Sequence, residues 1–225
     1  MRIKLLIITL FTLLFVDVQA QTSNPDSTKN GGNTKFRAIT GYGQTYRYGD
    51  YIVKSPYHTI SAGGHIEIPI KLGLGVETGM KYSFATGDRE QIYNHYDTAF
   101  FKYSGHWIDI PIRITYTLPI FWGMKIFGYA GPNINIGLSQ TSKTTYIPKE
   151  TDIPNPLEGY PVSGTYSLYG SELRRISFQL GAGGGVQWKN YRLRSGYDWG
   201  LSNVGMHKDR PEKIRGWHVT FEYEF

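Results

Sequence analysis

Arg215–Phe225, with the sequence RGWHVTFEYEF, decides the fold, because its side chains alternate strictly between two faces. One face is apolar and carries Trp217, Val219, Phe221, Tyr223 and Phe225, with Arg215 at its outer end. The opposite face is small or polar and carries Gly216, His218, Thr220, Glu222 and Glu224. A period of two is the signature of a β-strand whose two faces meet different environments. The chain therefore ends on a two-faced strand.

The same alternation recurs upstream and predicts seven further strands, while no segment shows a helical period. The predicted ranges are 34–44, 60–68, 72–82, 108–116, 124–136, 176–188 and 193–201. The two faces of the first strand cannot be assigned from the pattern. Pro111 and Pro132 fall inside strands, where a proline removes a ladder donor, so we expect bulges or local breaks there.

The connections between these strands alternate in length. They count about 13, 3, 22, 7, 37, 3 and 12 residues along the chain, which places every long loop at one end. A soluble sandwich has no reason for this asymmetry, whereas an up-and-down membrane barrel shows it. We therefore predict an all-β fold, an eight-stranded antiparallel up-and-down transmembrane β-barrel with short periplasmic turns and long extracellular loops.

The polar faces distinguish this barrel from a soluble one that would carry a ligand inside. They are dominated by Gly, Asn, Gln and Ser with isolated charges, unlike the charge-dense surface expected against water. Acidic and basic residues nearly balance, as a narrow interior requires. The predicted interior charge network is Glu67, Glu77, Lys81, Asp109, Arg113, Lys125, Arg192, Arg194, Asp198, Glu222 and Glu224. Inward glycines are expected to leave room for its long Arg and Lys side chains.

Aromatic residues near the strand ends of the apolar faces predict the two girdles of a membrane barrel. They are Trp107, Tyr116, Trp122, Trp188, Trp199, Trp217 and Tyr223. Composition agrees, since Phe, Trp and Tyr make up 15% of the 225 residues and 27 residues are Gly. The mean hydropathy of −0.35 averages lipid-facing strands with a polar interior and polar loops. No apolar run after residue 20 approaches the ~18 residues of a spanning helix.

The first 20 residues predict a cleaved signal peptide. Arg2 and Lys4 precede an apolar run from Leu5 to Val16, and Ala20 closes a small-residue cleavage site. Residues 21–33 read as a flexible periplasmic leader, and 34–225 as a single barrel domain in the outer membrane. The chain has no cysteine, so it would enter an oxidising compartment without disulfides. The net charge of +6 is spread along the chain, and we expect no nucleic-acid partner.

Four segments carry a family resemblance: Trp107–Tyr116 (WIDIPIRITY), Tyr129–Pro132 (YAGP), Leu180–Val186 (LGAGGGV) and Leu193–Asn203 (LRSGYDWGLSN). They resemble strands of the PorT-like outer-membrane β-barrel family common in Bacteroidetes. It covers roughly residues 36–225 and implies an eight-stranded barrel in the outer membrane. One branch of that family is linked to protein secretion across the envelope, but the loops of this chain carry no matching motif.

Complete catalytic sets are absent from the sequence. Ser104 and His106 lie two apart and could pair as nucleophile and base in an enzyme of the lipid A acyl hydrolase type. The stretch Gly200–Asn203 (GLSN) has Gly200 where a lipid A deacylase has its histidine. Gly181–Gly185 lacks the spacing of a phosphate-binding loop. The six histidines have no metal-ligand spacing, so we expect no enzyme activity, no cofactor and no metal.

Function is therefore expected to reside in the loops, 45–57, 83–105 and 139–173, which are rich in tyrosine. Tyrosine gives rigid, amphipathic contact area suited to recognition, although these side chains could equally extend the barrel wall. We expect a monomer with a structural, adhesive or envelope-assembly role. The envelope-assembly role includes a part in protein secretion. The expected partners are outer-membrane lipid, the barrel-assembly machinery through Trp217–Phe225, and an unidentified extracellular or envelope protein through the loops.

Overall fold

The computed structural model describes residues 33–49, 56–93, 97–147, 162–206 and 211–225. The expected signal peptide, and the expected leader up to residue 32, lie outside these ranges. The strands are β1 (Lys35–Tyr48), β2 (Pro56–Pro69), β3 (Leu74–Tyr93), β4 (Asp97–Pro119), β5 (Met124–Ile147), β6 (Gly164–Ser167), β7 (Ile176–Trp188), β8 (Tyr191–Gly200) and β9 (Lys213–Glu224). The described part of the chain contains no helix long and apolar enough to cross a membrane.

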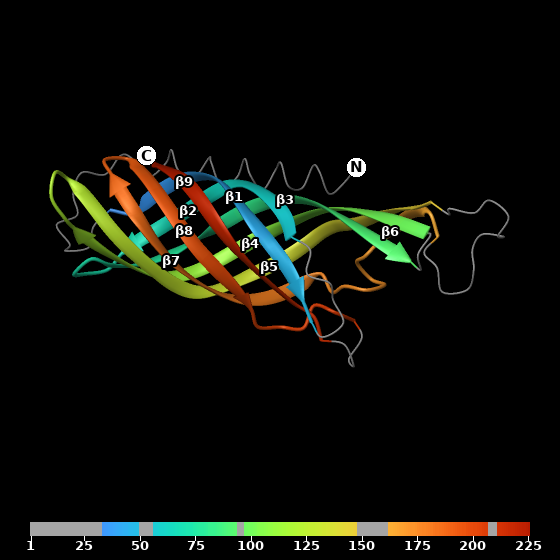
Figure 1. The fold of residues 1–225 in the computed structure, drawn as a ribbon. Helices are drawn as coiled ribbons and strands as arrows, with labels where there is room; N and C mark the ends of the chain where they lie inside the picture. The colour runs from blue at the N-terminus through green and yellow to red at the C-terminus, as the bar shows by residue number, and fades with distance from the viewer. Residues whose placement is uncertain (1–32, 50–55, 94–96, 148–161, 207–210) are drawn as a thin grey trace. The chain divides into compact units, whose positions relative to one another are not determined.

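Eight of these strands close into a ring (Figure 1). Each pairs antiparallel with its neighbour in the order β4-β3-β2-β1-β9-β8-β7-β5, and β4 pairs with β5 to complete the circle. The seam joins the first and last strands, with Arg37 opposite Glu224 and Tyr48 opposite Lys213. Closure leaves the ring without a free edge. The predicted eight-stranded up-and-down barrel is thus confirmed.

Tight turns connect the strands at the end where the chain enters and leaves the barrel. In two of them a residue with positive φ precedes a glycine, namely Leu72 (55°) with Gly73 (82°), and Trp122 (56°) with Gly123 (72°). The third turn consists of Lys189 and Asn190, between β7 and β8. Such left-handed positions let the chain reverse within a few residues. Leu72 and Trp122 are 90% and 85% exposed at these tips.

The two faces of the sheet are inverted relative to a soluble protein. Side chains that point into the ring are mostly polar or charged, and those that point outward are Ile, Leu, Val, Phe, Tyr and Trp. Ile60, Ile114 and Phe178, for example, are more than half exposed on the outer surface. A surface of this kind is stable only against lipid. Trp107 departs from prediction, because it lines the lumen with Asp109 rather than an outer girdle.

The ladder is interrupted at the prolines, as expected, and keeps its register. Between β4 and β5 the pairs stop at Pro111 and resume at Ile114. On the other side of β4, the pairs with β3 are missing between Ile112 and Asp109, and there the Thr78 hydroxyl donates to the Pro111 carbonyl oxygen at 2.9 Å. The bulge of this ladder lies elsewhere, at Leu138, where the register shifts between His106 and Trp107.

Three strands continue well beyond the ring at the opposite end from the tight turns, so the predicted loops are partly wrong. β3 and β4 form one long hairpin that pairs as far as Tyr93 and Asp97, through most of the expected loop 83–105. β5 continues to Ile147, and β6 pairs with it at Thr141–Thr144, inside the expected loop 139–173. The sequence of these segments lacks the alternation of apolar and polar residues that marks the lipid-facing strands.

Candidate functional site: a charged lumen, a cavity and a lid

The lumen near the tight turns is filled by a network of buried ion pairs. Arg37 on β1, Arg192 and Arg194 on β8, Glu67 on β2, Glu77 on β3 and Glu222 on β9 are each at most 4% exposed. Arg37 Nη1 lies 2.6 Å from Glu67 and its Nη2 2.8 Å from Glu224, while Arg192 Nη1 lies 3.2 Å from Glu67. Uncompensated charges would be unstable here, so these pairs are interdependent.

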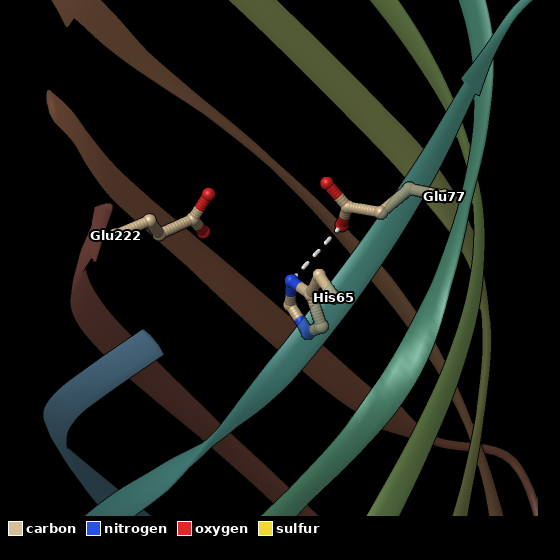
Figure 2. Close-up of side chains that lie close together, drawn as sticks. All are labelled: His65, Glu77 and Glu222. Atoms are coloured by element: carbon tan, nitrogen blue, oxygen red, sulfur yellow. Dashed lines mark ion pairs between the residues drawn. The ribbon is translucent and has the colours of Figure 1, made fainter. Parts of the chain in front are cut away.

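Arg194 occupies the centre of the network. It binds Glu77 with two hydrogen bonds, of 2.7 Å and 2.5 Å, and its Nε lies 2.9 Å from Glu222. His65 Nδ1 lies 3.5 Å from Glu77, and Figure 2 shows His65, Glu77 and Glu222 converging from three strands. These three groups have the spacing of metal ligands. The Arg194 guanidinium already supplies the cation between the two carboxylates, so the arrangement is a salt-bridge network.

Two aromatic rings from β5 separate the arginines. The Arg192 guanidinium lies 3.5 Å from the centroid of the Phe127 ring, and Arg194 and Arg113 lie 4.4 Å and 4.6 Å from that of Tyr129. Ring faces attract cations, so the stack keeps like charges apart while stabilising each. Glycines make room for it, since a Cβ at Gly183 or Gly185 would overlap Tyr129 or Phe127. The glycines thus accommodate aromatic rings as well as charged side chains.

Above this network, two aspartates organise a second polar layer. Asp109 accepts hydrogen bonds from Asn135 (2.8 Å), Ser83 (3.1 Å) and Asn133 (3.2 Å), and Lys81 lies 3.7 Å away. Asp198 lies 3.3 Å from His218 and 3.4 Å from Arg113. Each carboxylate therefore has a cationic or protonatable partner, and both stand at the floor of a cavity.

The cavity lies between this floor and the end of the barrel that carries the long connections. Its volume, counted as the space that the centre of a water molecule can occupy, is about 70 Å³. Its wall includes Trp107, Tyr57, Gln179 and Gln140, and Tyr169 lines it from above. A smaller space of about 10 Å³ continues beneath it, beside Arg113 and Arg194. The lumen is thus hollow in its upper part and closed below.

Residues Leu168–Arg175, called the lid below, fold across the upper end. Leu168 and Leu173 pack with Val204 in a small hydrophobic cluster, against Tyr103 and Ile214. Backbone bonds hold the lid on both sides, from Gly137 to Arg175 (2.6 Å) and from Arg174 to Val204 (2.8 Å). Burial raises the pKa of the Tyr169 phenol, against the opposing effect of Arg175, so this phenol stays protonated at neutral pH.

The structure places ten of the eleven predicted charges in these two layers. Glu67, Glu77, Arg192, Arg194, Glu222 and Glu224 belong to the lower network, and Lys81, Asp109, Arg113 and Asp198 to the upper layer. Lys125 also points inward but has no ion-pair partner among the described residues.

Sequence reasoning missed Arg37, His65, His218 and Tyr129. The alternation within β9 and β5 already placed His218 and Tyr129 on the polar faces. Arg37 carried no comparable signal, because both faces of the first strand look mixed. Its role became visible only when β1 closed against β9 and brought it beside Glu224.

The structure gives Ser104 and His106 separate partners on the outer face. Ser104 Oγ lies 3.0 Å from Thr141 Oγ1, and His106 Nδ1 lies 2.6 Å from the Tyr82 hydroxyl. In the GLSN stretch, Ser202 accepts a bond from the Phe178 amide and Asn203 accepts bonds from the Gly205 and Glu212 amides. The Ser202 and Asn203 side chains therefore form hydrogen bonds with backbone amides.

Comparison with known proteins places the chain among outer-membrane barrels. A family model described as "Outer membrane protein beta-barrel domain" matches residues 19–205. No curated protein matches the sequence. Among solved structures, Ail of Yersinia pestis is 16% identical, with 86% of this chain and 100% of that chain covered and a TM-score of 0.42. Neisserial surface protein A is 14% identical, covering 86% and 98% with a TM-score of 0.45.

Proposed function

We infer that this chain, which belongs to the outer membrane protein beta-barrel domain family, is a non-enzymatic outer-membrane protein that binds an extracellular or envelope protein. The membrane-spanning ring would serve as the anchor. The binding surface would be the four-stranded extension, defined as residues 87–93 of β3, 97–103 of β4, 141–147 of β5, and β6. This role agrees with the outer-membrane location of the family.

The continuation of β3, β4 and β5 beyond the ring carries the proposal. The last pair between β2 and β3 is His58 with Thr86, whereas β3 and β4 remain paired up to Tyr93 and Asp97. The ring closes without these extra residues, because its eight strands are already paired all round below them. Their hydrogen-bonded backbone is a pre-organised surface, which reduces the entropy lost on binding.

The side chains of the four-stranded extension suit recognition. Phe100 and Tyr166 are 42% and 44% exposed. Asp88, Lys102 and Lys143 form a cross-strand row, since Lys102 is paired with both of the other two. Aromatic anchors within a charged surround are typical of protein interfaces.

Other roles have less support. A channel would need an open lumen, and the buried ion pairs close the lower half of the barrel. A lipid A hydrolase would need Ser104 activated by His106, and these two side chains have other partners. The resemblance to PorT-like proteins makes a secretion component one candidate partner. Recognition by the assembly machinery would use the outer face of β9, which ends beside Phe225.

The test removes the β3–β4 half of the extension while keeping the ring, the lid, β5 and β6. Gly87 and Tyr103 are directly paired, so a two-residue turn can replace residues 88–102 without a change of register. Crosslinking and pull-down from native envelopes should then lose proteins captured by the full chain. Heat-dependent mobility on denaturing gels checks that the shortened barrel folds. An unchanged set of captured proteins with a folded barrel would refute the proposal.

A further inference from the structure

The cavity beneath the lid is enclosed by the ring and separate from the four-stranded extension. Its floor consists of Lys81, Asp109, Asp198 and His218, and Tyr169 of the lid lines its upper end. Nothing in the proposed anchoring or binding role requires a hollow at this place. The lower half of the same lumen shows that side chains can fill it.

The size of the cavity limits what it can hold. A water molecule needs about 10–15 Å³ of space for its centre, so the ~70 Å³ corresponds to roughly five waters. Since each water takes about 30 Å³ of liquid volume, their displacement frees on the order of 150 Å³. This matches one six-membered ring with its substituents.

The charges around the cavity are already compensated. Lys81 lies 3.7 Å from Asp109, and Asp198 is paired with His218 and Arg113. At the upper end, Arg47 lies 3.0 Å from Glu212. A charged ligand would bring an unpaired charge into this enclosed space, at a large desolvation cost. The preferred ligand is therefore neutral.

Two polar side chains of the wall keep unused hydrogen-bonding capacity. Gln179 accepts a bond from Asn133 through Oε1, and its two amide protons have no partner among the described residues. Arg47 Nε is buried without a hydrogen-bond partner among the described residues. Trp107, Tyr57 and Tyr169 add aromatic surface beside these groups.

We propose that this cavity is a binding site for a small neutral polyhydroxylated molecule of monosaccharide size. The C–H face of a sugar ring packs on aromatic side chains, while its hydroxyls bond with amides and carboxylates. Aromatic side chains and hydrogen-bonding groups both line this cavity. The charged side chains at its floor are already paired. A few convergent polar groups within an aromatic wall are typical of small-molecule sites.

Calorimetric titration of the full folded chain in detergent tests the site. The probes are glucose, galactose and N-acetylglucosamine, with glucosamine and glucuronate as charged analogues. We expect saturable binding of at least one neutral sugar, and at least tenfold weaker binding of both charged analogues. The variant Gln179→Leu should weaken binding of the neutral sugar at least tenfold, because it removes hydrogen bonds to its hydroxyls.

The matched control is Gln187→Leu, the same change on the same inner face of β7 but in the lower network. Gln187 is 3% exposed and bonds to Lys189 and Glu224, far from the cavity. The affinity of the Gln187→Leu variant for the neutral sugar should equal that of the unaltered chain. Absence of saturation by every neutral sugar, stronger binding of a charged analogue, or equal losses in both variants would each overturn the proposal.

Discussion

Arg194 and Glu77 form a two-pronged ion pair across the lumen, from strands that lie diametrically opposite in the ring. Four strand steps separate β8 from β3 in either direction, and the two hydrogen bonds measure 2.7 Å and 2.5 Å. Both side chains are at most 1% exposed. This contact joins opposite strands through the lumen and so stabilises the ring. The backbone hydrogen bonds join only neighbouring strands.

Loss of one partner of this pair should destabilise the barrel strongly. Arg194→Met removes the cation that lies nearest to both Glu77 and Glu222, and we expect a loss of about 3–5 kcal/mol in the free energy of unfolding. Urea titration in detergent, followed by tryptophan fluorescence, measures it. Lys125→Met is the control, since Lys125 points inward and has no ion pair within the described part of the chain. Similar losses in the two variants would show that the pair has no special role.

The aromatic ring between the arginines should also contribute. Phe127→Leu removes the face on which Arg192 lies at 3.5 Å, and we expect the barrel to lose about 1–2 kcal/mol beyond the change in apolar volume. Phe178→Leu, on the outer surface of the neighbouring strand β7, is the matched control. Unfolding measurements with equal effects at the two positions would contradict the cation–π assignment.

Glycines on the inner face should tolerate no side chain. In Gly183→Ala the new methyl group would overlap the Tyr129 hydroxyl and the Ser195 carbonyl oxygen, so we expect destabilisation of about 1–3 kcal/mol. Gly128→Ala, on the outer face of β5, meets only one atom at 3.8 Å and should leave stability nearly unchanged. The fraction that refolds into the heat-shifted form on gels provides the comparison.

The lid should open independently of the barrel. Leu173→Ala creates a cavity in the cluster with Leu168 and Val204, and its cost of about 2–5 kcal/mol should be local. Hydrogen exchange at residues 168–175 should accelerate while exchange in the ring strands does not change. Leu201→Ala, at a residue 56% exposed, is the control. Protection of the lid that persists in Leu173→Ala would refute its dependence on this cluster.

Prediction from sequence succeeded where the signal is local. The alternation of Ile108–Tyr116 or Trp217–Phe225 indicates that one face meets lipid and the other a polar lumen. This pattern depends only on residues that are neighbours in the sequence. Prediction failed for the hairpin from Gly87 to Tyr103, because the residues of this hairpin do not alternate between apolar and polar. Leu168–Arg175 shows no periodicity either, so the lid could not be foreseen.

The sequence by itself determined the number of ring strands, the inverted faces and the end of the barrel that carries the long connections. Only the tertiary structure decided which charges meet. Arg37 and Glu224 are 187 positions apart and become partners through closure of β1 on β9. Closure also brought the lid over the lumen and left a cavity beneath it. Side-chain period is a property of neighbours along the chain, whereas pairing across a lumen depends on the register of every strand in the ring.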